Sequence, residues 1–377
     1  MNKIAVIGAG KFGTAMAFAC CQNSKNLVYL YSRNTAKVDS INHNGKSSEF
    51  PDLHLNIIAS SNLAEVILDA EYIFLTVSSS SLMEVVDQIK QALQVKKSNS
   101  TVNILLCTKG IYFTDGTLFY SDAIEKIIPE AKIYVLSGPS FASEIVSGVR
   151  TSVSVACKNI HDAQQLQTNI FEGSNLFTVP STDVRGLQIL GAFKNVIGIR
   201  SGIEEGFANV IFEQVKPINE QHTKVECYNK IAVLMMNLIN ESRKLLEITG
   251  CEKDTIFSLA GMGDILLTCA SLKSRNRILG ETIGKEMAKI AINKLDKQQV
   301  ESIIKSFIGK ESFISDFIAK ENIAKQIKER LVLNDNTIEG IKPAVKLCQY
   351  CEANNIKLPE LGLTSVILQA VKKDTQI

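Results

Sequence analysis

The sequence predicts an α/β protein in which a doubly wound, mostly parallel sheet is followed by an all-helical region. An apolar strand pattern near the N-terminus runs directly into a glycine-rich turn, and strand and helix patterns alternate as far as about residue 180. Beyond Thr182 only helical periodicity remains. Because 377 residues exceed what one hydrophobic core usually supports, we expect two domains, 1–182 and 183–377.

The glycine-rich turn predicts a dinucleotide site. Residues 4–7 form a short apolar run typical of a buried parallel strand, and Gly8, Gly10 and Gly13 follow with G-x-G-x-x-G spacing. The first glycine permits a tight turn, the second lets the backbone approach a pyrophosphate, and the third lets the helix of residues 14–21 pack on the strand. Because the motif lies between a strand and a helix, a Rossmann-type domain is favoured over a turn that binds nothing.

The residue that follows the second strand pattern, 26–31, bears on the choice of cofactor. NAD-specific sites carry an Asp or Glu at this point to bind the ribose 2′-hydroxyl, whereas an arginine suits a 2′-phosphate. This chain has Arg33 there. The sequence therefore predicts that NADP(H) is preferred and that NAD(H) can also be used. The alternative is an arginine that is only solvated at a strand end.

Two later segments should meet at the same edge of the sheet. Further strand patterns cover 72–77, 102–107, 132–136, 151–156 and 176–179, with helical stretches at 82–93 and 118–128. Ligands of doubly wound sheets bind at the carboxyl ends of the strands, which is where 107–110 and 137–142 lie. Lys109 brings a positive charge there, and Ser140 is expected to open a helix whose free N–H groups suit an anion.

The helical region places a lysine on an otherwise apolar stripe. Helices are expected at 186–198, 230–249, 298–308, 311–329, 339–353 and 359–371, and the polar stretch 208–227 is a candidate insertion. Lys194 shares a face with Leu187, Leu190, Gly191 and Gly198. A buried amine has a lowered pKa and can act as acid or base near neutrality. The alternative is a lysine that snorkels to water, but the adjacent Asn195 and the glycines leave room for a ligand.

A lone carboxylate and a short polar run lie further along the helical region. Asp264 follows a pair of glycines and precedes an apolar run, and the simplest alternative is that it caps the next helix. Ser274, Arg275 and Asn276 come shortly after it. Such a run can hold a phosphate by charge and hydrogen bonds, and arginine does so with fixed geometry.

Composition indicates a globular enzyme that acts on a small molecule. The formal net charge of +2 gives no sign of a nucleic-acid or membrane-surface partner, and no apolar run is long enough for a membrane anchor. The strand at residues 3–7 leaves no room for a leader, and nine cysteines then indicate a reducing compartment, so we expect a cytoplasmic protein. No metal site is expected, because Cys348 and Cys351 fall inside a helical pattern, where packing is favoured.

Taken together, these residues resemble NAD(P)-dependent glycerol-3-phosphate dehydrogenases over nearly the whole chain. The matching segments, in the family's order, are 8–14, 108–110, 137–142, 191–196, 259–264, 274–277 and 338–340. The resemblance implies hydride transfer between NAD(P)H and dihydroxyacetone phosphate, which gives glycerol 3-phosphate for phospholipid synthesis. A homodimer is also expected. The chain departs from the family pattern between Gly206 and Lys230, where its polar segment is longer.

The resemblance also implies roles for individual residues. Lys194 becomes the proton donor and acceptor, with Lys109 and Asp264 as further catalytic groups. The substrate site comprises Lys109, Gly138, Ser140, Lys194, Asn195, Asp264, Thr268, Ser274, Arg275 and Asn276. Together with the glycine motif, the dinucleotide site comprises Gly8, Gly10, Lys11, Phe12, Gly13, Arg33, Lys109, Ala142, Arg275 and Glu339.

Two other functions remain open. A related lysine-dependent hydroxyacid or ketopantoate-type reductase would also use Lys194, but it leaves the polar run 274–276 without a role. The other is a non-catalytic NADP-sensing module whose activity was lost when the stretch 208–227 appeared, although a sensor has little reason to keep a lysine on an apolar stripe. Short-chain dehydrogenases are excluded, because no tyrosine is followed by a lysine four residues later.

Overall fold

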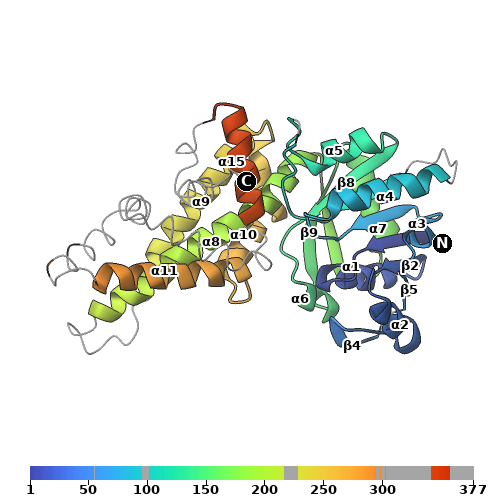
Figure 1. Cartoon of the computed structure of the whole chain (residues 1–377), viewed down its shortest axis with the longest axis horizontal. Helices are drawn as coiled ribbons and strands as arrows, with labels where there is room; N and C mark the ends of the chain where they lie inside the picture. Colours follow the sequence, from blue (N-terminus) through green and yellow to red (C-terminus); the bar gives the residue numbers. More distant parts are fainter. Residues whose placement is uncertain are drawn as a thin grey trace. The chain divides into compact units, whose positions relative to one another are not determined.

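The computed structural model describes residues 1–54, 56–95, 102–114, 116–215, 228–293, 298, 302 and 341–356. The chain divides into two compact units. Unit 1 consists of Met1–Gly191 and Phe257–Asp264, and unit 2 consists of Ala192–Ile256 and Ile265–Ile377. Within the described ranges, unit 1 holds the strands and unit 2 is helical (Figure 1). The predicted α/β class, with a helical C-terminal region, is confirmed.

Unit 1 is built on an eight-stranded sheet with the order β10-β9-β8-β7-β6-β1-β2-β5. Its strands are β1 (Asn2–Ile7), β2 (Asn26–Tyr31), β5 (Ile58–Ser60), β6 (Tyr72–Leu75), β7 (Val102–Leu106), β8 (Ala131–Ser137), β9 (Thr151–Cys157) and β10 (Leu176–Ser181). Neighbouring strands are parallel except β8 and β9, which are antiparallel. The strand order reverses direction at β1, with β2 on one side and β6 on the other, so the turn after β1 lies at the topological switch point of the sheet.

Helices cover both faces of the sheet (Figure 1). They are α1 (Lys11–Cys21), α2 (Thr35–Asn44), α3 (Leu63–Ile67), α4 (Leu82–Val95), α5 (Tyr120–Ile127), α6 (Ala142–Val146), α7 (Ile160–Ile170) and the start of α8 (Val184–Val215). Alternate residues of β1 supply two separate cores, because successive side chains of a strand point to opposite faces. Ile4 and Val6 belong to the core with α1 and α7, whereas Ala5 and Ile7 belong to the core with α4 and α5. A separate hairpin pairs β3 (Lys46–Ser47) with β4 (Phe50–His54).

The described part of unit 2 contains the rest of α8 together with α9 (Tyr228–Ile248), α10 (Asp264–Ala270), α11 (Arg275–Asn293) and α15 (Ile341–Ala353). A 3-10 turn, η2 (Lys253–Phe257), and a π turn, η3 (Leu259–Gly263), join α9 to α10. The first predicted helix of this region extends much further than expected, since α8 has 32 residues.

The candidate insertion 208–227 lies partly on α8. Residues 208–215 are the last turns of α8, and they stay helical because their apolar side chains, among them Ala208, Val210 and Ile211, are buried. Residues 216–227 lie outside the described part of the chain. So do the expected helices 311–329 and 359–371, most of 298–308, and Glu339.

Helices α8 and α11 are in direct backbone contact where glycines face the partner helix. A Cβ on Gly202 would lie 2.1 Å from the carbonyl oxygen of Arg277, and one on Gly206 would lie 2.0 Å from that of Glu281. In return, a Cβ on Gly280 would lie 2.1 Å from the carbonyl oxygen of Ile199. Any side chain at these positions would force the two helices apart, so the glycines determine how closely α11 lies against α8.

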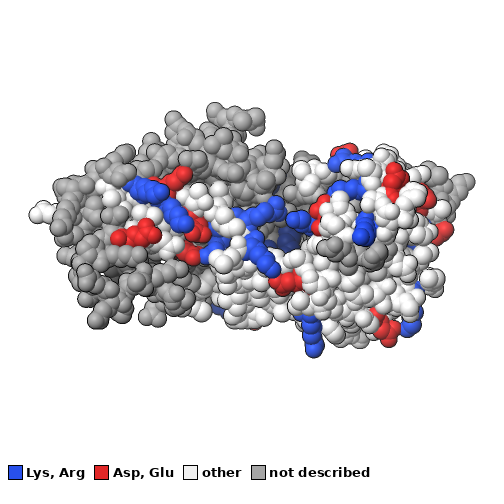
Figure 2. All heavy atoms as spheres, turned by 90° about the horizontal axis from the view of Figure 1, so that it is seen from below, with Lys and Arg blue, Asp and Glu red and all other residues white. Residues whose placement is uncertain are grey.

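Basic and acidic side chains are interspersed over the face of the molecule shown in Figure 2. Within the described ranges, none of the helices combines the length and the apolar composition that a bilayer span requires.

Candidate active site

The glycine turn after β1 is closely packed on one side and open on the other. A Cβ on Gly13 would lie 1.8 Å from the carbonyl oxygen of Gly8, so this position accepts only glycine. A Cβ on Gly10 would have nothing within 4 Å. The hydroxyl of Thr76, just after β6, lies 2.9 Å from the carbonyl oxygen of Ile7 and 3.0 Å from that of Gly8. The turn is therefore fixed by contacts with the segment after β6, and the first N–H groups of α1 have no acceptor within the helix.

The segment after β2 turns directly into α2. Ser32 is buried and its N–H donates to the carbonyl oxygen of Ser60, whereas Arg33 is exposed. Asn34 caps α2, since its side-chain oxygen accepts a hydrogen bond from the N–H of Lys37 at 3.2 Å. Arg33 thus stands at the carboxyl end of β2 with its side chain toward solvent, next to the start of a capped helix.

Lys109 and Asp264 form an ion pair within unit 1. The ammonium Nζ of Lys109, in the loop after β7, lies 2.9 Å from Oδ2 of Asp264. The two side chains are 19% and 1% exposed, respectively. A buried carboxylate is stable only when a cation or several hydrogen bonds compensate its lost hydration, and Lys109 supplies that cation. Burial raises the pKa of the neighbouring Cys107 thiol to about 12, against the opposing effect of the Lys109 charge, so this thiol stays protonated near neutrality.

The loop that carries Lys109 is fastened to the loop after β6. The hydroxyl of Thr108 donates to the carbonyl oxygen of Val77 at 2.8 Å. Gly110 lies against Ser79 and Tyr120, and the Tyr120 hydroxyl donates to the carbonyl oxygen of Ser79 at 3.0 Å. The sequence drew attention to Lys109, but Tyr120, which holds the loop, carried no local signal.

Asp264 reaches Lys109 because the segment Phe257–Asp264 returns from the helical region to unit 1. Ala260 is fully buried in the core beneath α4 and α5. Gly263 lies against the ring of Pro139, and the Ser258 hydroxyl accepts a hydrogen bond from the N–H of Gly261 at 3.2 Å. Asp264 is the last residue of this segment and the first of α10, so the π turn and its packing deliver the carboxylate to the first unit.

In the segment 137–142, the helix starts later than the sequence predicted. The helix expected to open at Ser140 begins at Ala142, is only five residues long, and has Phe141 as its N-cap without a side-chain hydrogen bond. The Ser140 hydroxyl instead donates to the carbonyl oxygen of Gly138 at 3.0 Å. Gly138 has φ of 148°, and a Cβ there would meet the backbone of Val153 at 3.1 Å. The helix therefore begins two residues later than expected, and a helix N-terminus at Ser140 was a wrong prediction.

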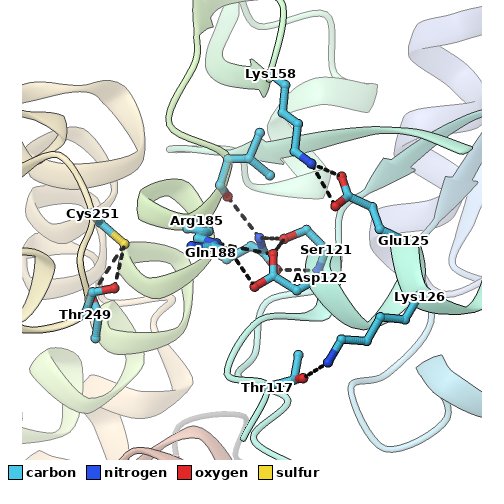
Figure 3. Close-up of polar contacts among 11 residues, drawn as sticks. Thr117, Ser121, Asp122, Glu125, Lys126, Lys158, Arg185, Gln188, Thr249 and Cys251 are labelled. Carbon is cyan, nitrogen blue, oxygen red and sulfur yellow. Dashed lines mark hydrogen bonds and ion pairs between the residues drawn. The ribbon is translucent and has the colours of Figure 1, made fainter. Parts of the chain in front are cut away.

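The first turns of α8 are anchored to α5 by polar contacts (Figure 3). The Gln188 side chain is buried, with Oε1 accepting from the N–H of Ser121 at 3.1 Å and Nε2 donating to the Ser121 hydroxyl at 2.8 Å. Arg185 pairs with Asp122 at 3.0 Å. The position of α8 in unit 1 thus depends on side chains for which sequence patterns gave no role.

Lys194 and Asn195 lie further along α8, in unit 2. Lys194 is half-buried between the buried Phe193 and Asn195, and Leu187 and Leu190 on its stripe are buried as expected. The amide of Asn276 on α11 donates to Oδ1 of Asn195 at 3.0 Å. The other two amide atoms, Nδ2 of Asn195 and Oδ1 of Asn276, are buried without a hydrogen-bond partner. A buried amide that is only half satisfied is unusual in a folded protein and calls for a further partner.

The other predicted substrate residues of unit 2 lie on α10 and at the start of α11. A Cβ on Gly198 would lie 2.8 Å from the methyl carbon of Thr268. The absence of a side chain at Gly198 therefore leaves space for this methyl group. The Ser274 hydroxyl accepts from the N–H of Arg277 at 3.3 Å and caps α11, while Arg275 is exposed. Burial raises the pKa of Cys269, one residue after Thr268, to about 11, although its hydrogen bond to Ser201 and the charges of Arg277 and Lys194 lower it.

The second arginine of the 274–277 run has a role that the sequence did not suggest. Arg277 is buried, and its Nη2 contacts both carboxylate oxygens of Glu205 on α8. This ion pair adds a polar link to the glycine-lined contact of α8 and α11. It holds the start of α11, and with it Asn276, against the helix that carries Asn195.

Cysteines and acidic residues of the described ranges form no group that could hold a metal ion. Cys348 and Cys351 are buried on α15 and form no disulfide.

Comparison with known proteins identifies the family. The model described as NAD-dependent glycerol-3-phosphate dehydrogenase N-terminus matches residues 3–163, and the corresponding C-terminus model matches residues 183–313. A glycerol-3-phosphate dehydrogenase (NAD(P)+) of Neorickettsia sennetsu is 35% identical over 276 residues, which cover 72% of this chain and 74% of that protein. The chain belongs to the NAD-dependent glycerol-3-phosphate dehydrogenase family.

Other members of the glycerol-3-phosphate dehydrogenase family show similar agreement. The glycosomal NAD(+) enzyme of Leishmania mexicana is 30% identical over 308 residues, covering 80% of this chain and 79% of that protein. Among solved structures, the glycerol-3-phosphate dehydrogenase of Coxiella burnetii has a TM-score of 0.70 at 22% identity, covering 100% of this chain and 99% of that one. That of Plasmodium falciparum has a TM-score of 0.64 at 17% identity, covering 100% and 96%. At these identities the two structures support the fold alone.

Proposed function

We propose that this enzyme transfers hydride reversibly between NAD(P)H and dihydroxyacetone phosphate, giving glycerol 3-phosphate for phospholipid synthesis. The observation that carries the proposal is the buried Asn195–Asn276 pair beside Lys194, whose two unpartnered amide atoms suit a polar ligand. The names of the relatives, which are glycerol-3-phosphate dehydrogenases, support this choice of substrate.

The dinucleotide is proposed to bind in the domain 1–182. The open face of Gly10 and the N-terminus of α1 suit a pyrophosphate, which has two negative charges and approaches a glycine backbone closely. The cofactor contacts that the family resemblance implies are Gly8, Gly10, Lys11, Phe12, Gly13, Arg33, Lys109, Ala142, Arg275 and Glu339, of which Glu339 lies outside the described residues. When bound, NAD(P)H supplies the hydride.

The substrate is proposed to bind to the residues that the sequence motifs and the family resemblance single out. Hydride addition at C2 leaves an alkoxide, and the Lys194 ammonium donates a proton to that oxygen as the general acid. Lys109 adds positive field, and Asp264 fixes its ammonium. The phosphate and hydroxyl groups of the substrate are proposed to be held by Gly138, Ser140, Asn195, Thr268, Ser274, Arg275 and Asn276. Binding energy from the phosphate, remote from C2, then orients the reacting carbon.

A preference for NADPH over NADH is the finer part of the proposal. Arg33 is exposed at the carboxyl end of β2, where an acidic residue would otherwise bind the ribose 2′-hydroxyl. We expect Arg33→Asp to lose or reverse the preference, measured as the ratio of kcat/KM for the two cofactors. Arg150, exposed and outside the glycine turn, gives a matched control as Arg150→Asp. An unmodified enzyme that strongly prefers NADH would contradict this reading of Arg33.

The substrate proposal is tested by steady-state oxidation of NADPH and NADH with dihydroxyacetone phosphate, with unphosphorylated dihydroxyacetone and ketopantoate as competitors. Rapid oxidation only with the phosphorylated ketone is expected. Faster reduction of ketopantoate would favour the related reductases. Tight binding of NADPH without oxidation by any of these ketones would favour the sensing module.

Localisation and assembly are also proposed. A cytoplasmic location agrees with the eight described cysteines, none of which forms a disulfide. The homodimer stays a prediction, which light scattering behind size-exclusion chromatography would check.

A further inference from the structure

A small hairpin brings an acidic side chain beside the glycine turn. The turn between Ser47 in β3 and Phe50 in β4 carries Glu49, whose N–H donates to the Ser47 hydroxyl at 3.2 Å. The hairpin is attached to α2, because the Ser40 hydroxyl donates to the carbonyl oxygen of Lys46 at 3.0 Å. Neither the hairpin nor α2 was expected from the sequence, and both lie in unit 1.

Lys37 on α2 links this hairpin to the glycine turn. Its ammonium Nζ lies 2.7 Å from Oε1 of Glu49 and 3.4 Å from the carbonyl oxygen of Ala9, between Gly8 and Gly10. The side chains of Lys37 and Glu49 are 29% and 22% exposed, so the pair is partly shielded from water. An ammonium has three N–H donors, and the described residues supply acceptors for two of them.

The position of Lys37 is that expected for a group that meets the 2′ substituent of the adenine ribose. In doubly wound folds the pyrophosphate lies over the glycine turn, and the ribose lies between that turn and the carboxyl end of β2. Lys37 touches the glycine turn through Ala9 and lies four residues after Arg33, in the first turn of α2. A 2′-phosphate held by Arg33 would therefore be within the reach of a second cation.

We propose that Lys37 is a second residue for the 2′-phosphate of NADP(H) and that Glu49 competes with this phosphate for the Lys37 ammonium. With NAD(H), Lys37 stays paired with Glu49, so its charge keeps a counter-ion beside the 2′-hydroxyl and Arg33 alone faces that hydroxyl. With NADP(H), the 2′-phosphate replaces Glu49 as the partner of the Lys37 ammonium, and the Glu49 carboxylate is then hydrated by solvent. Breaking the Lys37–Glu49 ion pair weakens NADP(H) binding by the energy of that pair. Glu49 thereby limits the preference set by Arg33 and keeps both cofactors usable.

This inference rests on the proposed cofactor site but not on the substrate. It is tested by calorimetric titration of the full chain with NADPH, NADH, 2′,5′-ADP and 5′-ADP at one salt concentration, without dihydroxyacetone phosphate. Lys37→Gln should weaken NADPH and 2′,5′-ADP binding about tenfold, the value of one charge-assisted hydrogen bond, and leave NADH and 5′-ADP unchanged. Glu49→Gln should strengthen NADPH and 2′,5′-ADP binding about threefold, as expected for removal of a partly exposed ion pair.

A double variant separates competition from simple repulsion. If Glu49 acts by occupying Lys37, then Glu49→Gln should have little effect once Lys37→Gln is present. Lys46→Gln, an exposed lysine of the same hairpin, is the matched control and should change neither cofactor.

Three results would overturn the proposal. Equal weakening of NADPH and NADH by Lys37→Gln would mean that Lys37 only supports the glycine turn through Ala9. No change with Lys37→Gln would remove it from the site. An undiminished effect of Glu49→Gln in the double variant would reduce Glu49 to a repulsive charge. Failure to reduce dihydroxyacetone phosphate would refute the proposed substrate while leaving these binding results unaffected.

Discussion

Two polar pairs, one in each unit, occupy predicted site positions and differ in how completely they satisfy each other. In unit 1, the Lys109 cation lies against the almost fully buried Asp264 anion. In unit 2, Asn195 and Asn276 share one hydrogen bond, and each keeps one buried amide atom without a partner. The first pair matches charge with charge, whereas the second retains one donor and one acceptor.

The difference indicates two kinds of site residue. An ion pair that is already formed contributes to the fold and to a fixed field, and it changes little when a ligand arrives. A buried amide left unsatisfied costs about 1–3 kcal/mol, and a ligand that supplies the missing partner regains that energy on binding. We therefore expect variants of the first pair to affect stability first, and variants around the second to affect substrate kinetics first.

The largest effect is expected at Lys194, next to the amide pair. Lys194→Ala should lower turnover by roughly 10²–10⁴-fold, the range for loss of a positioned acid or base, without weakening NADPH binding. Lys194→Arg should fail as well, because arginine keeps its proton near neutrality. Steady-state kinetics and NADPH titration measure both effects, and Lys244→Ala, an exposed lysine on α9, is the control. Near-normal turnover of Lys194→Ala would refute its role, and near-normal turnover of Lys194→Arg would reduce it to a supplier of positive field.

The next largest effect is expected in the ion pair. Lys109→Gln takes the ammonium away from a carboxylate that is 1% exposed and should lower the free energy of unfolding by about 3 kcal/mol. Asp264→Asn should cost less, since the Lys109 side chain is 19% exposed and its ammonium can reach water. The double variant should recover most of the loss, because no buried charge is then separated from its partner. Urea denaturation measures the free energy of unfolding of all three variants. A double variant less stable than Lys109→Gln would contradict the interpretation of Lys109 and Asp264 as a matched ion pair.

The smallest effect is expected from the amide pair itself. Asn276→Leu removes one unpartnered atom but deprives Asn195 of its hydrogen bond, so the free energy of unfolding should change by less than about 1 kcal/mol. The KM for dihydroxyacetone phosphate should rise about tenfold, because a hydrogen bond to the substrate is lost. Denaturation and kinetics on the same sample test the contrast. A large loss of stability with an unchanged KM would show that the two asparagines are structural.

Much of the first unit could be predicted because its strands are continuous apolar runs. The buried residues of β1, β6 and β7 can only belong to a sheet covered on both faces, and their patterns locate them within two residues. The antiparallel direction of β9 left no such trace, since a buried strand has the same composition in either direction. Helix α2 and the β3–β4 hairpin are short and largely exposed, so their apolar periodicity is too weak to detect.

Local motifs indicate candidate site residues, but they do not indicate which side chains these residues contact. Lys109 and Asp264 are 155 positions apart, and only the burial of Ala260 brings the carboxylate back to the sheet. Ser140 was misplaced because a serine after a proline looks like a helix cap, whereas its hydroxyl is used by the carbonyl oxygen of Gly138. Glu49 and Lys37 were missed because their proximity depends on a hairpin without a sequence signal.

Because Phe257–Asp264 belongs to unit 1, an N-terminal fragment cannot contain the whole of that unit. A fragment that ends at Gly191 would contain the whole sheet and the glycine turn, yet it would lack Ala260 from its core and the Asp264 counter-ion of Lys109. Unit 1 is therefore discontinuous in sequence, and a single truncation cannot isolate it intact. An autonomous version would need residues 257–264 reattached through a designed linker.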